Sequence, residues 1–237
     1  AEISQALIES PVIAKVSFTG SIAVGRQLGE LSARHGKRYT AELGGHAPVI
    51  VCADADPRAV AQLSVVAKYR NAGQVCASPI RFLVHRSRYE AFRDAFVAAA
   101  QGLRVGPGSD PATQLGPVIG EHRVREMQAF VDDAIAHGAR LLCGGHRINR
   151  SGFFYAATVL EQPAADARVQ REEPFGPIAV LDVFDELDDA LARANALPYG
   201  LAAYGFTHDL SSAHRLANEL EAGMVGINHF GVSQPET

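Results

Sequence analysis

The amino-acid sequence predicts an α/β fold built around a parallel β-sheet. Short apolar runs typical of strands alternate with segments whose apolar residues recur at helical spacing, which is the pattern of β-α-β units. The chain has 237 residues, and 47% of them are hydrophobic. A chain of this size can bury a substantial core, either as one large domain or as two small ones.

Helices are expected where a start signal precedes an apolar face. Asp56 and Pro57 start one helix, because an acidic cap followed by proline is favourable in the first turn. Ser87 and Glu90 form a capping box for a second helix, which Gly102 ends. Further helices are expected after residue 21, over residues 124–138 and over residues 209–223.

Apolar and β-branched runs predict the strands between these helices. The runs cover residues 13–17, 49–52, 81–84, 141–143, 178–184, 202–206 and 224–227. A stretch rich in proline and glycine over residues 105–117 predicts a surface excursion.

The composition favours a soluble protein that acts on small molecules. The net charge is −4 and no block of lysine and arginine occurs, so we expect no nucleic-acid partner and no anionic membrane partner. No apolar run is long enough to cross a bilayer, and the first residues lack the basic region of a secretory signal. We therefore expect a cytoplasmic location.

The three cysteines differ in their surroundings. Their spacing fits neither a redox pair nor a zinc ribbon, so a reduced compartment is expected. Cys52 and Cys143 follow apolar strand runs and are interpreted as buried residues. Cys76 has polar and glycine neighbours, which favours an exposed position on a turn. The nine histidines show no metal-ligand spacing, so no metal site is predicted.

Cys76 and Glu42 together can support acyl chemistry. Cys76 lies between a predicted helix and a strand, and Glu42 ends another strand just before Gly44 and Gly45. A thiolate attacks carbonyl carbons, and a carboxylate in a partly closed apolar pocket can activate water. From these residues alone, Cys76 could equally be a half-buried structural thiol. Glu42 could likewise only cap a backbone amide.

Six short motifs cover nearly the whole chain. They are Phe18-Thr19-Gly20-Ser21 with Gly25, Glu42-Leu43-Gly44-Gly45, Gly73-Gln74-Val75-Cys76, Glu173-Pro174-Phe175-Gly176-Pro177, Pro198-Tyr199-Gly200-Leu201 and Gly223-Met224-Val225-Gly226-Ile227-Asn228. In this order they resemble the motifs of the NAD(P)-dependent aldehyde dehydrogenase superfamily, and most closely its succinate-semialdehyde dehydrogenases.

The resemblance implies a fold and a domain division. Residues 1–42 are expected to be the C-terminal part of a Rossmann-like cofactor domain. Residues 43–237 are expected to be the catalytic domain, with a parallel-sheet α/β core, truncated at its C-terminal end. The chain is thus interpreted as an inactive fragment that lacks both ends, and the full-length protein is expected to be a homodimer or homotetramer.

The resemblance also implies the residues of a site for NAD or NADP. Ser21 would contact the cofactor phosphates, with Gly20, Gly25 and Leu43 beside it. Without the resemblance, Ser21 would be interpreted as an ordinary helix cap. Glu173 would hold the nicotinamide ribose, and Phe175 would pack near the ring. Without the resemblance, Glu173 would be a solvated acid in a turn.

A substrate anchor follows from the succinate-semialdehyde group. Arg70 matches an arginine that binds the distal carboxylate of the substrate, and two parallel hydrogen bonds suit that pairing. Ser233 is a second candidate for the same anchor. From position alone, Arg70 is a cation at a helix C-terminus.

The expected activity is oxidation of an acid semialdehyde to the carboxylic acid through a Cys76 thiohemiacetal and thioester. Three alternatives remain open. The thioester could pass to coenzyme A, although Glu42 argues against this. The chain could be a papain-like cysteine hydrolase, although no histidine lies in a partner motif. It could also be a binding or scaffold fragment without catalysis.

Overall fold

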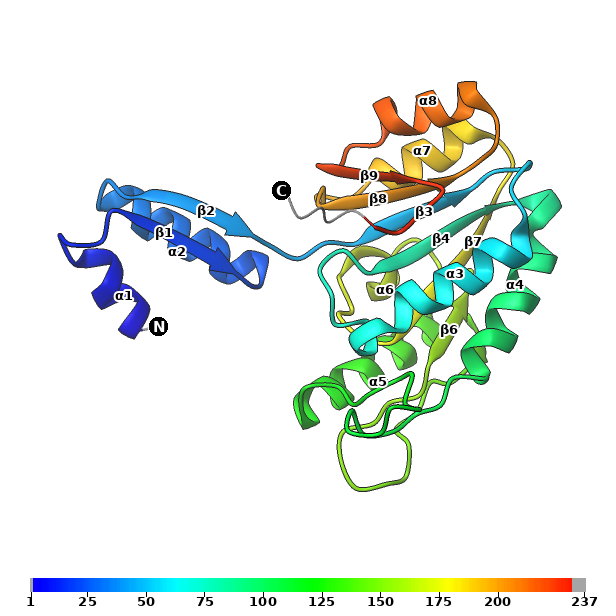
Figure 1. Ribbon diagram of the computed structural model, residues 1–237, viewed down its shortest axis with the longest axis horizontal. Helices are drawn as coiled ribbons and strands as arrows, with labels where there is room; N and C mark the ends of the chain where they lie inside the picture. The colour runs from blue at the N-terminus through cyan, green and yellow to red at the C-terminus, as the bar shows by residue number, and fades with distance from the viewer. Residues whose placement is uncertain (1, 232–237) are drawn as a thin grey trace. The chain divides into compact units, whose positions relative to one another are not determined.

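The computed structural model describes residues 2–231 and divides the chain into two compact units, residues 1–44 and 45–237 (Figure 1). The first unit holds α1 (Glu2–Glu9), β1 (Lys15–Thr19), α2 (Ile22–Arg34) and β2 (Arg38–Glu42). β1 and β2 pair in parallel, with Thr19 opposite Glu42. The helix that follows residue 21 is therefore the crossover of a β-α-β unit.

The second unit contains a seven-stranded sheet in the order β5-β6-β7-β4-β3-β8-β9. All neighbours are parallel except β5, which is antiparallel to β6. The parallel α/β fold predicted from the sequence is thus confirmed. The strands are β3 (Ala47–Val51), β4 (Pro79–His85), β5 (Arg140–Cys143), β6 (Thr158–Glu161), β7 (Ile178–Phe184), β8 (Ala202–Phe206) and β9 (Met224–Ile227).

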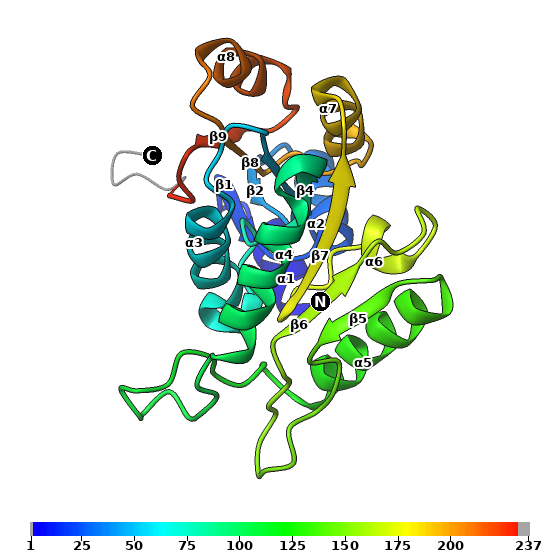
Figure 2. The ribbon, with the colours of Figure 1, turned by 90° about the vertical axis from the view of Figure 1, so that its right-hand side faces the viewer.

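Helices cover both faces of this sheet (Figure 2). They are α3 (Pro57–Tyr69), the 3-10 turn η1 (Arg70–Gly73), α4 (Arg86–Gln101), α5 (Glu121–Ala136), α6 (Arg168–Arg171), α7 (Leu187–Asn195) and α8 (Leu210–Glu219). In the part of the chain that is described, no helix is long and apolar enough to cross a membrane.

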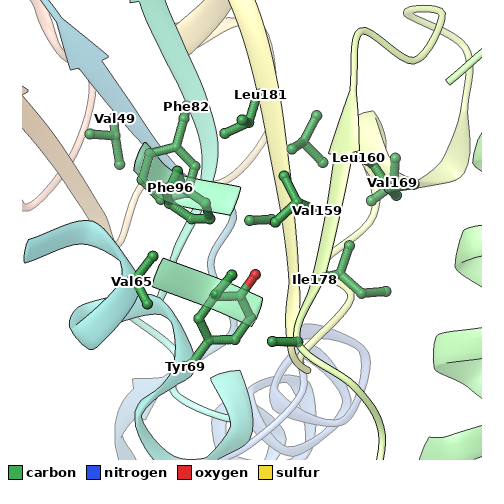
Figure 3. Packing of buried hydrophobic residues seen from close by; sticks show 14 of the residues in the cluster. Val49, Val65, Tyr69, Phe82, Phe96, Val159, Leu160, Val169, Ile178 and Leu181 are labelled. Carbon is green, nitrogen blue, oxygen red and sulfur yellow. The ribbon is translucent and has the colours of Figure 1, made fainter. Parts of the chain in front are cut away.

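The alternation of strand side chains divides the core into two clusters. Val49 and Phe82 point into the larger cluster with residues of α3, α4 and α5, and Figure 3 shows part of it. Ile50 and Leu83, their direct neighbours in sequence, point into the smaller cluster with residues of α7 and α8. A parallel sheet buried on both faces explains why these strands are continuous apolar runs.

Two local predictions are corrected by the structure. The second helix begins at Arg86 with His85 as its cap, whose ring nitrogen accepts from the Ser87 backbone N–H at 3.2 Å, so Ser87 is not the cap. Cys143 is half-buried rather than buried, because β5 is an edge strand. Cys52 is buried as predicted.

Candidate active site

The turn that follows α3 carries unusual backbone geometry. Asn71, Ala72 and Gly73 have φ angles of 51°, 54° and 70°. Such angles are rare for residues other than glycine and cost free energy. A Cβ on Gly73 would lie 2.1 Å from the carbonyl oxygen of Gly176, so only glycine fits there. The chain therefore turns sharply just before Cys76.

Hydrogen bonds from Gln74 hold this turn. The Asn71 side chain donates to the Gln74 carbonyl at 3.0 Å, and the Gln74 side chain donates to the Asn71 carbonyl at 3.2 Å. The Gln74 side-chain oxygen also accepts from the Ile119 backbone N–H at 2.9 Å. Gln74 thus ties the strained turn to the loop before α5.

Cys76 lies in the next turn and is partly exposed. The Ser78 N–H donates to the Val75 carbonyl at 2.9 Å and closes this turn. The Tyr204 hydroxyl, from β8, donates to the Ala77 carbonyl at 2.7 Å. These bonds fix the backbone on which the thiol is presented. No motif or pattern in the sequence singles out Tyr204.

Gly45 packs against the other side of the Cys76 backbone. A Cβ at Gly45 would lie 2.8 Å from the Cys76 carbonyl oxygen, so a larger residue would push the turn away. The Gly45 N–H donates to a carboxylate oxygen of Glu173 at 3.2 Å. Gly45 therefore links Cys76 to Glu173, two residues that the sequence analysis placed in one site.

Glu173 is half-buried in the loop before β7. Burial raises the pKa of its carboxyl, and the Gly45 N–H and the charges of Lys68 and Arg123 oppose that rise. Next to it, Phe175 has a φ of 42°, and the Arg123 guanidinium lies 5.5 Å from the centre of its ring. Glu173 and Phe175 thus form an acceptor beside an aromatic face.

Lys68 contacts the Cys76 turn and was not predicted as a site residue. Its side chain is fully buried, and its Nζ donates to the Ser78 hydroxyl at 3.2 Å. Burial lowers its pKa to about 7, and the charge of Glu173 opposes this lowering. A signal was present, because Lys68 shares the buried face of α3 with Ala61 and Val65.

Arg70 ends α3 as its C-cap and is exposed. Burial raises the pKa of Tyr204 to about 12. The charge of Arg70 opposes this rise, and the charge of Cys76 adds to it. The two groups therefore both lie close enough to Tyr204 to act on it through their charges. Ser233, the second predicted anchor, lies outside the described residues.

In the first unit, Ser21 caps α2 and accepts from the Val24 N–H at 3.5 Å. A Cβ at Gly25 would lie 2.4 Å from the Leu43 side chain, so packing inside the unit already requires glycine. The Gly20 N–H donates to the Glu42 carbonyl at 3.0 Å. Glu42 belongs to the first unit and Cys76 to the second, and their pairing stays a prediction.

The second unit is a parallel α/β domain that presents a thiol on a strained turn beside a half-buried carboxylate. Over residues 1–237 the sequence matches the aldehyde dehydrogenase family. The chain therefore belongs to the aldehyde dehydrogenase family, as its motifs predicted.

Relatives of this chain act on several named substrates. It is 51% identical over 236 residues to 4-(hydroxymethyl)benzenesulfonate dehydrogenase TsaD1 of Comamonas testosteroni, covering 100% of this chain and 49% of the relative. It is 40% identical over 226 residues to the succinate-semialdehyde dehydrogenase [NADP(+)] GabD of Escherichia coli, covering 95% and 47%. The chain thus spans about half the length of these relatives.

Solved structures agree with the fold. The crystal structure of succinate-semialdehyde dehydrogenase from Burkholderia pseudomallei matches with a TM-score of 0.95 and 42% sequence identity. The match covers 98% of this chain and 48% of that chain.

Proposed function

We propose that the full-length protein is an NAD(P)-dependent dehydrogenase that oxidises an aldehyde bearing an anionic group, with succinate semialdehyde as the first candidate. The observation that carries the proposal is that Cys76 is partly exposed on its turn and that Arg70, which ends the helix before that turn, is exposed as well. The substrates named for TsaD1 and GabD support it, because one carries a sulfonate and the other a carboxylate.

The residues of the second unit fit a nicotinamide cofactor. Glu173 has one carboxylate oxygen engaged by the Gly45 N–H, and a carboxylate can accept further hydrogen bonds from ribose hydroxyls. Phe175 adds an aromatic face beside it. When bound, the nicotinamide supplies the acceptor for the hydride that leaves the substrate carbon. The name of GabD, which includes NADP(+), supports the same cofactor class.

In the proposed reaction, the Cys76 thiolate attacks the aldehyde carbon, and the carbonyl oxygen becomes the alkoxide of a thiohemiacetal. Loss of hydride from that carbon restores the carbonyl as a thioester. The Cys76 backbone N–H is a candidate donor to the alkoxide. Water then adds to the thioester carbon, and the carboxylic acid leaves as the Cys76 thiolate is restored.

Glu42 is the proposed base for the hydrolytic step. It would take a proton from the attacking water, as a carboxylate does in general base catalysis. In the same proposal, residues 1–42 belong to the cofactor domain and residues 43–237 to the catalytic domain. Ser21, Gly20, Gly25 and Leu43 would then lie on the cofactor side, where the capped N-terminus of α2 suits a phosphate.

Turnover of the full-length protein tests this proposal. NAD or NADP reduction is measured with succinate semialdehyde and with butanal, a neutral aldehyde of similar size. Cys76→Ala should lower kcat by about 10³-fold or more, because the nucleophile is lost. Undiminished turnover in Cys76→Ala would remove the mechanism.

The same assay tests the substrate class. Arg70→Ala should raise KM for succinate semialdehyde about 10- to 100-fold, which is the effect of losing hydrogen bonds to a charged group, and should leave butanal oxidation nearly unchanged. Arg58→Ala is the matched control, because Arg58 is an exposed arginine at the other end of α3. An unchanged preference in Arg70→Ala would reject the anionic substrate.

A further inference from the structure

The groups around Cys76 form a closed chain of interactions that passes through Lys68. The Cys76 backbone contacts Gly45, and Gly45 donates to Glu173. The charges of Glu173 and Lys68 interact, and Lys68 donates to the Ser78 hydroxyl at 3.2 Å. Ser78 closes the turn that carries Cys76. The thiol turn and the carboxylate are therefore joined on both sides.

The burial of Lys68 at this position has a free-energy cost. Its side chain is fully buried, and among residues 2–231 its ammonium has a hydroxyl rather than a carboxylate as hydrogen-bond partner. Burying an ammonium without an ion pair costs free energy, and an apolar side chain of similar volume would avoid that cost. Packing alone therefore does not explain a lysine at this position.

The charges that face Lys68 indicate what it does. Glu173 acts on it from the loop before β7. His46, from the segment before β3, also faces it, but burial and nearby positive charges lower the pKa of His46 to about 3, so this ring is neutral at pH 7. The charge of Arg123, on α5, also acts on Glu173. Below a pH of about 7, Lys68 is thus a buried cation that balances the Glu173 carboxylate.

We propose that Lys68 is a positioning residue of the active site, which holds the Cys76 turn through Ser78 and balances the charge of Glu173 so that this carboxylate can hold the ribose of the cofactor. The inference rests on the proposed function, because it assigns the ribose to Glu173. Lys68 itself touches neither the substrate nor the cofactor in this proposal.

The charge of Lys68 has a measurable consequence for Glu173. An opposite charge favours the ionised carboxylate, so removing the amine should make Glu173 take up a proton at higher pH. A protonated Glu173 accepts fewer hydrogen bonds from ribose hydroxyls. Cofactor binding by a variant without the amine should therefore weaken earlier as the pH falls.

Lys68→Met tests this in the full-length protein, because methionine keeps an unbranched apolar stem. The Kd of NAD and of NADP is measured by calorimetry between pH 4.5 and pH 8. The pH at which binding weakens should rise by about one unit in Lys68→Met, and Glu173→Gln should abolish this dependence. Ser64→Ala is the matched control, because Ser64 is fully buried one turn earlier on α3 and should leave the profile unchanged.

A double-mutant cycle of unfolding midpoints gives a readout that needs no cofactor. Lys68→Met removes the charge interaction with Glu173. The change in unfolding midpoint that it causes should therefore be less favourable when Glu173 is present than in the Glu173→Gln background. Equal effects in both backgrounds would overturn the inference, as would an unchanged binding profile in a protein that does bind NAD or NADP. Should the wild type bind neither cofactor, the proposed function fails and the cycle alone decides the role of Lys68.

Ser78→Ala keeps the test decisive if Lys68→Met does not fold. It removes the hydroxyl that accepts from Lys68 and preserves the backbone bond that closes the turn. Without that acceptor the charged form of Lys68 is less favourable. The pH at which cofactor binding weakens should therefore rise, as in Lys68→Met, but by a smaller amount. A Ser78→Ala profile identical to that of the wild type would count against the inference.

Discussion

Burial distinguishes the three cysteines from one another. Burial raises the pKa of Cys52 and of Cys143 to about 11, so both remain protonated thiols at neutral pH. A thiol in that state is a poor nucleophile, because the thiolate is the reactive form. Cys76, partly exposed on its turn, is the cysteine that the surroundings leave available for chemistry.

Because of His46, the free energy of unfolding should fall as the pH becomes acidic. Burial lowers its pKa from 6.5 to about 3, and its Nε2 lies 3.0 Å from the Val169 carbonyl. The unfolded chain therefore binds a proton below pH 6.5 that the folded chain does not bind until about pH 3. The stability due to neutral His46 is complete above pH 6.5 and is lost as the pH falls.

Denaturant unfolding at pH 7 and at pH 4 measures this contribution. Replacing His46 with glutamine should make the loss of unfolding free energy between the two pH values smaller by roughly 3 kcal/mol. The exposed His208, changed to glutamine, is the control and should leave the loss as in the wild type. Equal losses in His46→Gln and the wild type would show that His46 is not buried as a neutral ring.

The turn between α3 and β4 should be intolerant of side chains at Gly73. Its φ is 70°, and a Cβ would meet the Gly176 carbonyl oxygen at 2.1 Å. Gly73→Ala should therefore destabilise the protein by more than the roughly 1 to 2 kcal/mol that positive φ alone costs, and should displace Cys76. Chemical denaturation and the rate of Cys76 alkylation by iodoacetamide measure the two effects.

Gly138→Ala measures the cost of a positive φ without a steric clash at the Cβ. Gly138 has a similar φ of 82°, but open space surrounds the position of its Cβ. This variant should show the cost of the backbone angle and no more, with Cys76 alkylation as in the wild type. If both variants lose the same stability, the approach of Gly73 to Gly176 is looser than the structure indicates.

Most helices and strands were predictable because their signals are local. The strand runs at 178–184, 202–206 and 224–227 agree with β7, β8 and β9. Asp56 caps its helix as predicted, and the helix expected over residues 209–223 begins after the cap Asp209. The cap of α4 was mispredicted because His85, an unusual cap, takes the role that Ser87 could fill. The left-handed angle of Ala72, just before Gly73, had no local signal, since alanine rarely adopts such an angle without tertiary constraint.

The assembly of the site was less predictable, because it depends on the order of the strands. Gly45 and Glu173 are 128 positions apart and form a hydrogen bond. They meet because β4 lies between β3 and β7 in the sheet, which places the segments before β3 and β7 near the Cys76 turn before β4. Family motifs indicated Glu173 and Cys76 but gave no reason to include Lys68 or Tyr204, whose roles require the folded sheet.

The division into two units predicts that residues 45–237 fold without the preceding segment. The seven-stranded sheet has hydrophobic cores on both faces, whereas β1 and β2, among residues 2–231, form a two-stranded sheet of their own. A chain of residues 45–237 should unfold in one cooperative transition. It should keep Cys76 as reactive toward iodoacetamide as in the whole chain, because the hydrogen bonds and packing described above for the Cys76 turn lie inside this unit. It should not turn over aldehydes, since Glu42 and Ser21 are absent. Circular dichroism and dye binding check the fold, and a gradual transition with exposed apolar surface would show that the sheet depends on the first unit.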